Sequence, residues 1–163
     1  MVYSLCGGWL RASASHVVKA SPLRVFWYSA DEENAPEWLS LVCEARRVDG
    51  TRIGLGSKSY FRADVFGFES EFISEVVEWR PLSRAGLVMV RRIKGPLTDF
   101  SMWLSYRGLD GRTRVDLAVE FELGLPPVAK QAVELAAKMS VDGKLRESLR
   151  RLSRLLEVMI PLA

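Results

Sequence analysis

Residues 17–38 read VVKASPLRVFWYSADEENAPEW and contain the end of a strand, the starts of two helices and the break between them. Ser21 followed by Pro22 is typical of an N-cap and a first helical residue, where the missing proline N–H costs nothing. Asn34 and Pro36 interrupt this first helix and begin a second, shorter one. The stretch therefore predicts one strand followed by two short helices. The buried face of the first helix is expected to carry Val25, Phe26 and either Tyr28 or Ser29.

Regular alternation on both sides of this stretch predicts the rest of the fold. A short strand over residues 14–20 precedes the first helix, and period-two alternation resumes at Cys43 and continues to Leu123. Turn signals rich in Gly, Pro and Asp divide this region into six strands, with Asp110-Gly111 as a strong hairpin dipeptide. Consecutive strands joined mostly by hairpins form an antiparallel meander.

One face of each predicted strand is apolar, and we expect it to line the inside of the sheet. In the last strand this face carries Val115, Leu117, Val119, Phe121 and Leu123. Its partner strand places together Phe100, Met102, Leu104 and Tyr106. Around the turn at Gly67, aromatic residues alternate with small ones, which leaves room for a void: Ser57, Ser59, Phe61, Ala63 and Val65, and Phe68, Ser70, Phe72, Ser74 and Val76.

After Pro126-Pro127 the apolar period becomes helical. The predicted stripe consists of Val128, Ala132, Leu135, Met139, Leu145, Leu149, Leu152, Leu156 and Met159. A helix this long needs the apolar face of the sheet to bury such a stripe. The sequence thus predicts an α+β fold in which a curved antiparallel sheet of about seven strands surrounds a long C-terminal helix. We expect residues 12–163 to form one domain and residues 1–11 to form a flexible leader.

Composition excludes several classes of function. The net charge of +3 lies entirely in residues 128–163, which hold seven basic and four acidic side chains, so no DNA-binding footprint is expected. Cys6, Cys43 and His16 share no metal-ligand spacing, and no glycine-rich phosphate loop indicates a cofactor. No apolar run approaches the ~20 residues of a membrane helix. With no secretory signal pattern, we expect a cytoplasmic protein.

The order of elements and several local motifs resemble the helix-grip (START/SRPBCC) superfamily, and within it the polyketide cyclase/dehydrase and lipid transport-like group. Asp31, Asn34, Pro36 and Trp38 are similar to its D-x-x-N-x-P-x-W opening. The segment EVVEWRPLSRAGLVM is similar to its E-x-x-E-W-x-P-x-x-R segment. The resemblance covers residues 12–160.

The resemblance implies a ligand cavity between the sheet and the C-terminal helix. There the protein would bind, transport or sense a small hydrophobic molecule, such as a lipid, an isoprenoid quinone or a polycyclic aromatic, without catalysis. Transferred to this chain, the binding residues are Trp38, Phe61, Phe68, Phe72, Met102, Leu104, Tyr106, Leu117, Val119, Leu135 and Met139. Aromatic and methionine side chains suit an adaptable apolar wall. The alternative is a solid core built from the same residues.

Two other functions remain open. A cyclase- or dehydratase-like enzyme would use the same cavity with Tyr106, alone or together with a carboxylate, projecting into it. This hypothesis predicts a buried titratable group with a shifted pKa beside the cavity. An interaction module would use the basic C-terminal helix, on which Arg150 and Arg154 share a face, against an anionic surface or RNA. An ordinary solvated face is the simpler interpretation of these two arginines. No oligomeric state follows from the sequence.

Overall fold

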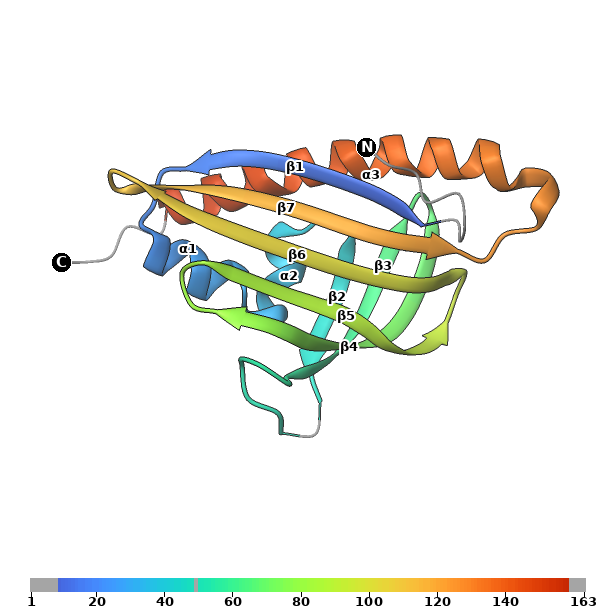
Figure 1. The fold of residues 1–163 in the computed structure, drawn as a ribbon, viewed down its shortest axis with the longest axis horizontal. Helices are drawn as coiled ribbons and strands as arrows, with labels where there is room; N and C mark the ends of the chain where they lie inside the picture. Colours follow the sequence, from blue (N-terminus) through green and yellow to red (C-terminus); the bar gives the residue numbers. More distant parts are fainter. Residues whose placement is uncertain (1–8, 49, 159–163) are drawn as a thin grey trace.

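A seven-stranded antiparallel sheet forms the framework of the protein (Figure 1). The computed structural model describes residues 9–48 and 50–158. The strands are β1 (Leu10–Val18), β2 (Val42–Arg47), β3 (Lys58–Val65), β4 (Phe68–Arg80), β5 (Arg84–Lys94), β6 (Leu97–Leu109) and β7 (Arg112–Leu123). Their order in the sheet is β1-β7-β6-β5-β4-β3-β2. The predicted six-stranded meander is confirmed, and β1 adds the seventh strand beside β7.

Strand alternation sets which side chains fill the interior. All five predicted inward residues of β7 are buried, as are the four of β6. The predicted faces of β3 and β4 are also buried, except that Phe68 is half-buried at the turn. The β6–β7 hairpin turns at Asp110 and Gly111, whose φ angles of 45° and 80° are the positive values that this dipeptide favours.

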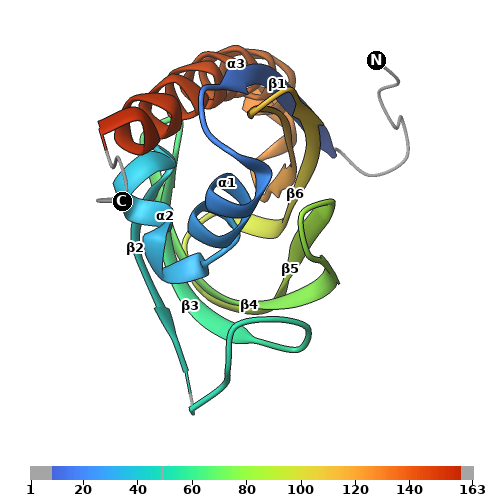
Figure 2. The same ribbon diagram turned by 90° about the vertical axis from the view of Figure 1, so that its left-hand side faces the viewer.

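Irregular pairing between β4 and β5 bends the sheet. The register shifts between Glu71 and Phe72, between Ile73 and Ser74, and between Val76 and Glu78. Extra residues of this kind increase the local twist and curvature of a strand pair. In the end-on view the sheet curls around an interior that is open on one side (Figure 2).

The short helices α1 (Pro22–Ser29) and α2 (Ala35–Trp38) and the 3-10 turn η1 (Glu32–Asn34) close this open side. Figure 2 shows α1 lying across the open end of the curled sheet. As predicted, Ser21 caps α1 by accepting a hydrogen bond from the Arg24 backbone N–H at 3.4 Å. The predicted buried face is confirmed with Val25, Phe26 and Ser29.

The chain enters the sheet earlier than the sequence analysis expected. β1 begins at Leu10, so Leu10 and Arg11, which were assigned to a leader, pair with Phe121 and Glu120 of β7. Residues 1–8 of that predicted leader lie outside the described part of the chain.

Helix α3 (Pro127–Val158) packs mainly against β1 and runs the length of the sheet (Figure 1). Its buried face carries Ala137, Val141, Leu145, Ser148, Leu149, Leu152, Ser153 and Leu156. The predicted stripe is therefore right for its second half and wrong for its first. Val128 is fully exposed, and Leu135 and Met139 are 56% and 66% exposed. Met159 lies outside the described residues.

Contacts with the rest of the fold set the rotation of α3 about its own axis. The Ser40 backbone N–H donates to Ser148 Oγ at 2.9 Å, and the Ser13 backbone N–H donates to Asp142 Oδ1 at 3.2 Å. These bonds turn Ala137 and Val141 toward the interior. Small side chains there also let the helix approach the sheet closely. The larger Leu135 and Met139 consequently face solvent.

Two leucines on α3 test this orientation. Leu145→Ala removes a side chain with no exposed surface, so we expect a loss of about 2–5 kcal/mol in the free energy of unfolding. Leu135→Ala is the matched control and should change it by no more than about 0.5 kcal/mol, because the side chain is already in water. Urea unfolding of both variants measures the difference. Equal losses would contradict the orientation described here.

Candidate functional site

A small, partly open cavity lies between the short helices and the middle of the sheet. Its volume is about 20 Å³, which is room for roughly one water molecule. Its wall comprises Ser29, Ala30, Glu32, Ala35, Val76, Trp79, Ala85, Gly86, Leu87, Met102 and Leu104. None of these residues belongs to α3. This cavity therefore lies at a different place from the one predicted between the sheet and the C-terminal helix, where buried leucines of α3 pack.

Small residues create the space inside this wall. Ala30 and Ala35 come from the segment between α1 and α2, and Ala85 and Gly86 come from β5. Gly86 is required for a second reason. A Cβ atom at this position would lie 2.2 Å from the ring of Trp103, its cross-strand neighbour. Any larger residue at position 86 would displace the Trp103 indole, so β5 carries no side chain at this point of the cavity wall.

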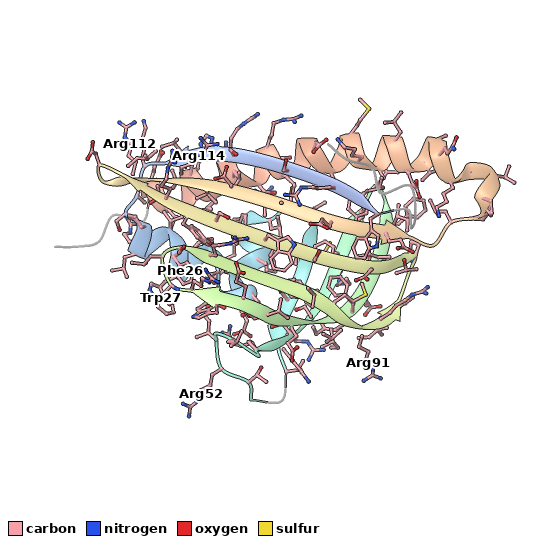
Figure 3. All side chains as sticks on the ribbon, viewed as in Figure 1. Phe26, Trp27, Arg52, Arg91, Arg112 and Arg114 are labelled. Atoms are coloured by element: carbon pink, nitrogen blue, oxygen red, sulfur yellow. The ribbon has the colours of Figure 1, made fainter. Side chains whose placement is uncertain are left out.

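Aromatic rings hold α1 against the sheet beside the cavity. Trp79, which lines the cavity, meets Phe26 at a ring-centroid distance of 5.0 Å and Trp27 at 5.8 Å, both near edge-to-face. Phe26 also meets Tyr106 at 5.2 Å. Such pairs contribute about 0.5–1.5 kcal/mol beyond the area they bury. Figure 3 places Phe26 and Trp27 at the end of the sheet where α1 lies.

A buried hydroxyl pair also joins α1 to β6. Ser29 Oγ donates to the Val25 carbonyl oxygen at 2.6 Å and lies 2.7 Å from Tyr106 Oη. Since the serine hydrogen is already used, the Tyr106 hydroxyl is the donor to Ser29. Burial raises the pKa of Tyr106 well above its ordinary value of 10.0. Tyr106 is thus a neutral phenol whose hydrogen is already bonded within the protein.

A buried carboxyl group forms the polar part of the cavity wall. The Glu32 side chain is 2% exposed, and its Oε2 accepts a hydrogen bond from Arg47 Nη1 at 2.9 Å. The same guanidinium binds the two neighbouring acids, with Nη1 2.7 Å from Asp31 Oδ1 and Nη2 2.7 Å from Glu33 Oε1. One arginine at the end of β2 therefore holds three consecutive carboxylates of the η1 segment in place.

The environment of Glu32 contains opposing influences on its pKa. Burial, the largest of them, raises the pKa of this carboxyl above its ordinary value of 4.5, and the nearby charge of Asp31 adds to the rise. The nearby backbone N–H of Glu32 itself and the Arg47 guanidinium lower it, but less strongly. A buried titratable group with a shifted pKa lies beside the cavity, as the enzyme hypothesis predicted.

The structure brings only some of the predicted binding residues to this cavity. Met102 and Leu104 line it, and Tyr106 is one hydrogen bond away through Ser29. Leu135 and Met139 were predicted to line it and do not, because their side chains extend into solvent from the outer face of α3.

The other predicted binding residues belong to the packed interior or its edge. Phe61 and Phe72 stack at 5.6 Å, and Phe72 contacts Phe100 at 5.3 Å. These rings fill the space that the sequence analysis treated as a void. Trp38, Leu117 and Val119 are also buried in this core, whereas Phe68 is half-buried beside Phe66.

Nine of the eleven wall residues were not among the predicted binding residues, and Glu32 and Ser29 are the polar ones of these nine. Glu32 stands between two other acids in a segment that reads as a solvated loop. Its exposure differs sharply from theirs, because the side chains of Asp31 and Glu33 are 24% and 45% exposed. Local sequence carries no indication of this difference, since the partner Arg47 is fifteen residues away on another strand.

Other predicted features lie on the surface. Arg150 and Arg154 are exposed on α3, as expected for either a solvated or a binding face. Figure 3 shows Arg112 and Arg114 close together at one end of β7, with Arg52 and Arg91 apart from them and from each other. Across residues 9–48 and 50–158, no cluster of three metal-ligating side chains occurs, and no helix is long and apolar enough to cross a membrane. Cys43 is exposed, and Cys6 lies outside the described residues.

Comparison with known proteins agrees with this architecture. A family model described as polyketide cyclase / dehydrase and lipid transport matches residues 10–157. No curated protein sequence matches the chain. Its fold is similar to that of a protein from Thermus thermophilus, with a TM-score of 0.73 and 22% identity over 92% of this chain and 99% of the other.

Two further solved structures share the fold. The Zhui aromatase/cyclase from Streptomyces sp. R1128 aligns with a TM-score of 0.70 and 15% identity, over 91% of this chain and 96% of that one. A START superfamily protein from Mycobacterium smegmatis aligns with a TM-score of 0.63 and 18% identity, over 93% and 99%. At these levels of sequence identity, the similarity shows a shared fold alone.

Trp38 offers a test of its role as core rather than cavity wall. It has no exposed surface and does not line the cavity. We expect Trp38→Ala to lower the free energy of unfolding by about 3–5 kcal/mol. Trp38→Phe should cost clearly less, because Nε1 has no hydrogen-bond partner among the described residues. Chemical unfolding measures both losses, and similar losses would indicate an unrecognised role for Nε1.

Glu32 predicts a specific pH dependence of stability. A carboxyl whose pKa is raised by folding loses its stabilising contribution as the pH rises from the unfolded value, 4.5, through the folded one. Relative to the wild type, Glu32→Gln should therefore be more stable at pH 7 than at pH 4. Urea unfolding at the two pH values measures this change. A relative stability that falls between pH 4 and pH 7 would show that the Arg47 pair lowers the pKa instead.

Proposed function

Because the chain belongs to the polyketide cyclase / dehydrase and lipid transport family, we propose that it binds a small hydrophobic molecule in the cavity beneath α1 and carries or senses it without catalysis. The composition of the cavity wall supports this proposal. Nine of its eleven residues are apolar or glycine, and the two polar ones, Ser29 and Glu32, lie together in the chain. Binding pockets for small molecules commonly combine an apolar wall with a few polar groups that fix orientation.

The size of the cavity limits the kind of ligand. At about 20 Å³ it cannot hold a molecule larger than water until its wall moves. We infer that the movable part of the wall is α1 with the segment after it, because α1 has only eight residues. It is fixed by ring contacts, one hydroxyl pair and a hydrogen bond from Arg24 Nη2 to the Leu156 carbonyl oxygen at 2.9 Å. Displacing one short helix suits a compact ring system such as a polycyclic aromatic or a quinone head better than a long acyl chain.

Glu32 favours a second candidate, a cyclase- or dehydratase-like enzyme that uses the same cavity. A carboxyl group whose pKa is raised by burial is suited to exchange a proton with a bound molecule. Tyr106 is less suited to this role, because its hydrogen is bonded to Ser29. In this version Glu32 would be the acid or base, and the apolar wall would exclude water.

Native mass spectrometry of the purified protein, followed by solvent extraction, tests the binding function. We expect an apolar molecule to accompany the wild type. Ala85→Phe fills the cavity and should remove that molecule, at a cost of about 1–3 kcal/mol in stability. Ala132→Phe adds the same side chain on the exposed face of α3 and is the matched control. Circular dichroism checks that both variants are folded.

The same experiment separates the two candidates. A folded Ala85→Phe protein that retains the molecule, or a wild type that carries none and binds none added, would contradict binding in this cavity. If the extracted molecule is returned to the wild type and its mass is unchanged, the carrier function is supported. Conversion that disappears in Glu32→Gln would support the enzyme.

A further inference from the structure

The hydrogen-bonding capacity of the cavity is unbalanced. Among the residues that the structure describes, Glu32 Oε1 is buried and has no hydrogen-bond partner. Arg47 accounts for the other oxygen of this carboxyl, while its remaining recorded bonds go to Asp31 and Glu33. Leaving a buried acceptor without a donor costs on the order of 1–3 kcal/mol, and more when the acceptor is charged.

The other polar groups at the cavity cannot correct this imbalance. Ser29, the second polar residue in the wall, has already given its hydrogen to the Val25 carbonyl oxygen at 2.6 Å. Tyr106 gives its own hydrogen to Ser29 at 2.7 Å. The carboxyl and hydroxyl groups of the cavity thus offer acceptors and no free donor. The remaining donor in the wall, the indole N–H of Trp79, lies on the side of Gly54, which is not part of the wall.

From this imbalance we propose that the cavity selects a neutral apolar molecule that carries a hydroxyl or N–H group and binds it through a hydrogen bond donated to Glu32 Oε1. This inference rests on the binding function proposed above and names the chemical class of the ligand. A hydrogen bond to a charged acceptor in a site with little water is stronger than one between neutral groups. A ketone or ester of the same shape places an acceptor against an acceptor, and a carboxylate adds charge repulsion.

Arg47 allows the preference to be reversed by one substitution. In Glu32→Gln the amide oxygen must face Arg47, because the guanidinium has donors and no acceptor. The amide NH₂ then takes the place of Oε1, and the cavity offers a donor. The variant should therefore prefer a carbonyl ligand. Glu33→Gln is the matched control, since Glu33 binds the same arginine but does not line the cavity.

Three compact probes of nearly equal shape measure the preference: 1-indanol, 1-indanone and indane. Isothermal titration calorimetry with the wild type should give at least about tenfold tighter binding of 1-indanol than of the other two. Glu32→Gln should lose that preference and bind 1-indanone at least as well as 1-indanol. Glu33→Gln should keep the wild-type order.

Each other outcome has a defined meaning. Equal binding of all three probes by the wild type would overturn the selection while leaving the binding function intact, as expected if a single water satisfies Oε1. Binding of none of them would contradict both the selection and the binding function. If Glu32→Gln does not fold, the affinities of the wild type for the three probes test the proposed selection by themselves. An unchanged order in a folded Glu32→Gln protein would show that another group makes the selection.

Discussion

The curled sheet has one apolar face that must be covered, and the rest of the structure depends on this constraint. Strands from β1 to β7 all turn buried residues toward the same interior. A single helix cannot cover so wide a surface. α3 packs along β1 with leucines that have no exposed surface, and the short segment from α1 to α2 covers the remaining side. The cavity lies where the cover made by this segment meets β4, β5 and β6.

The short cover is held by polar contacts as well as by packing, and these contacts place the chemistry. Arg47 at the end of β2 binds three acids in and beside η1, and this pairing turns Glu32 inward. Burying an ion pair is weak evidence for stability, because desolvation offsets much of the attraction. The clearer consequence of these ion pairs is the position of the Glu32 carboxyl group. The contact sets a carboxyl group in the wall of an otherwise apolar cavity, and a carrier and an enzyme would both use that group.

Much of the fold could be predicted because its elements follow local rules. Ser21 and Pro22 begin α1 as their chemistry requires, and Asp110-Gly111 forms the expected hairpin. The error in α3 has an identifiable cause. The predicted stripe was built from large apolar residues. It includes a step of six residues between Met139 and Leu145, which does not fit the spacing of three or four residues along one face of a helix. Ala137 and Val141 continue the period back from Leu145 in steps of four, and they are the residues that are buried.

The sequence by itself determined the faces of the strands, the places of the turns and the family resemblance, because these depend on periodicity and on residues close together in the chain. Only the tertiary structure decided which side of α3 is buried, where the cavity lies and which acid lines it. A helix can rotate about its own axis until partners such as Ser40 select one orientation. Likewise Asp31, Glu32 and Glu33 are equivalent in the sequence, and Arg47 of β2 binds all three. Only the packing of η1 against β2 makes the middle one the buried one.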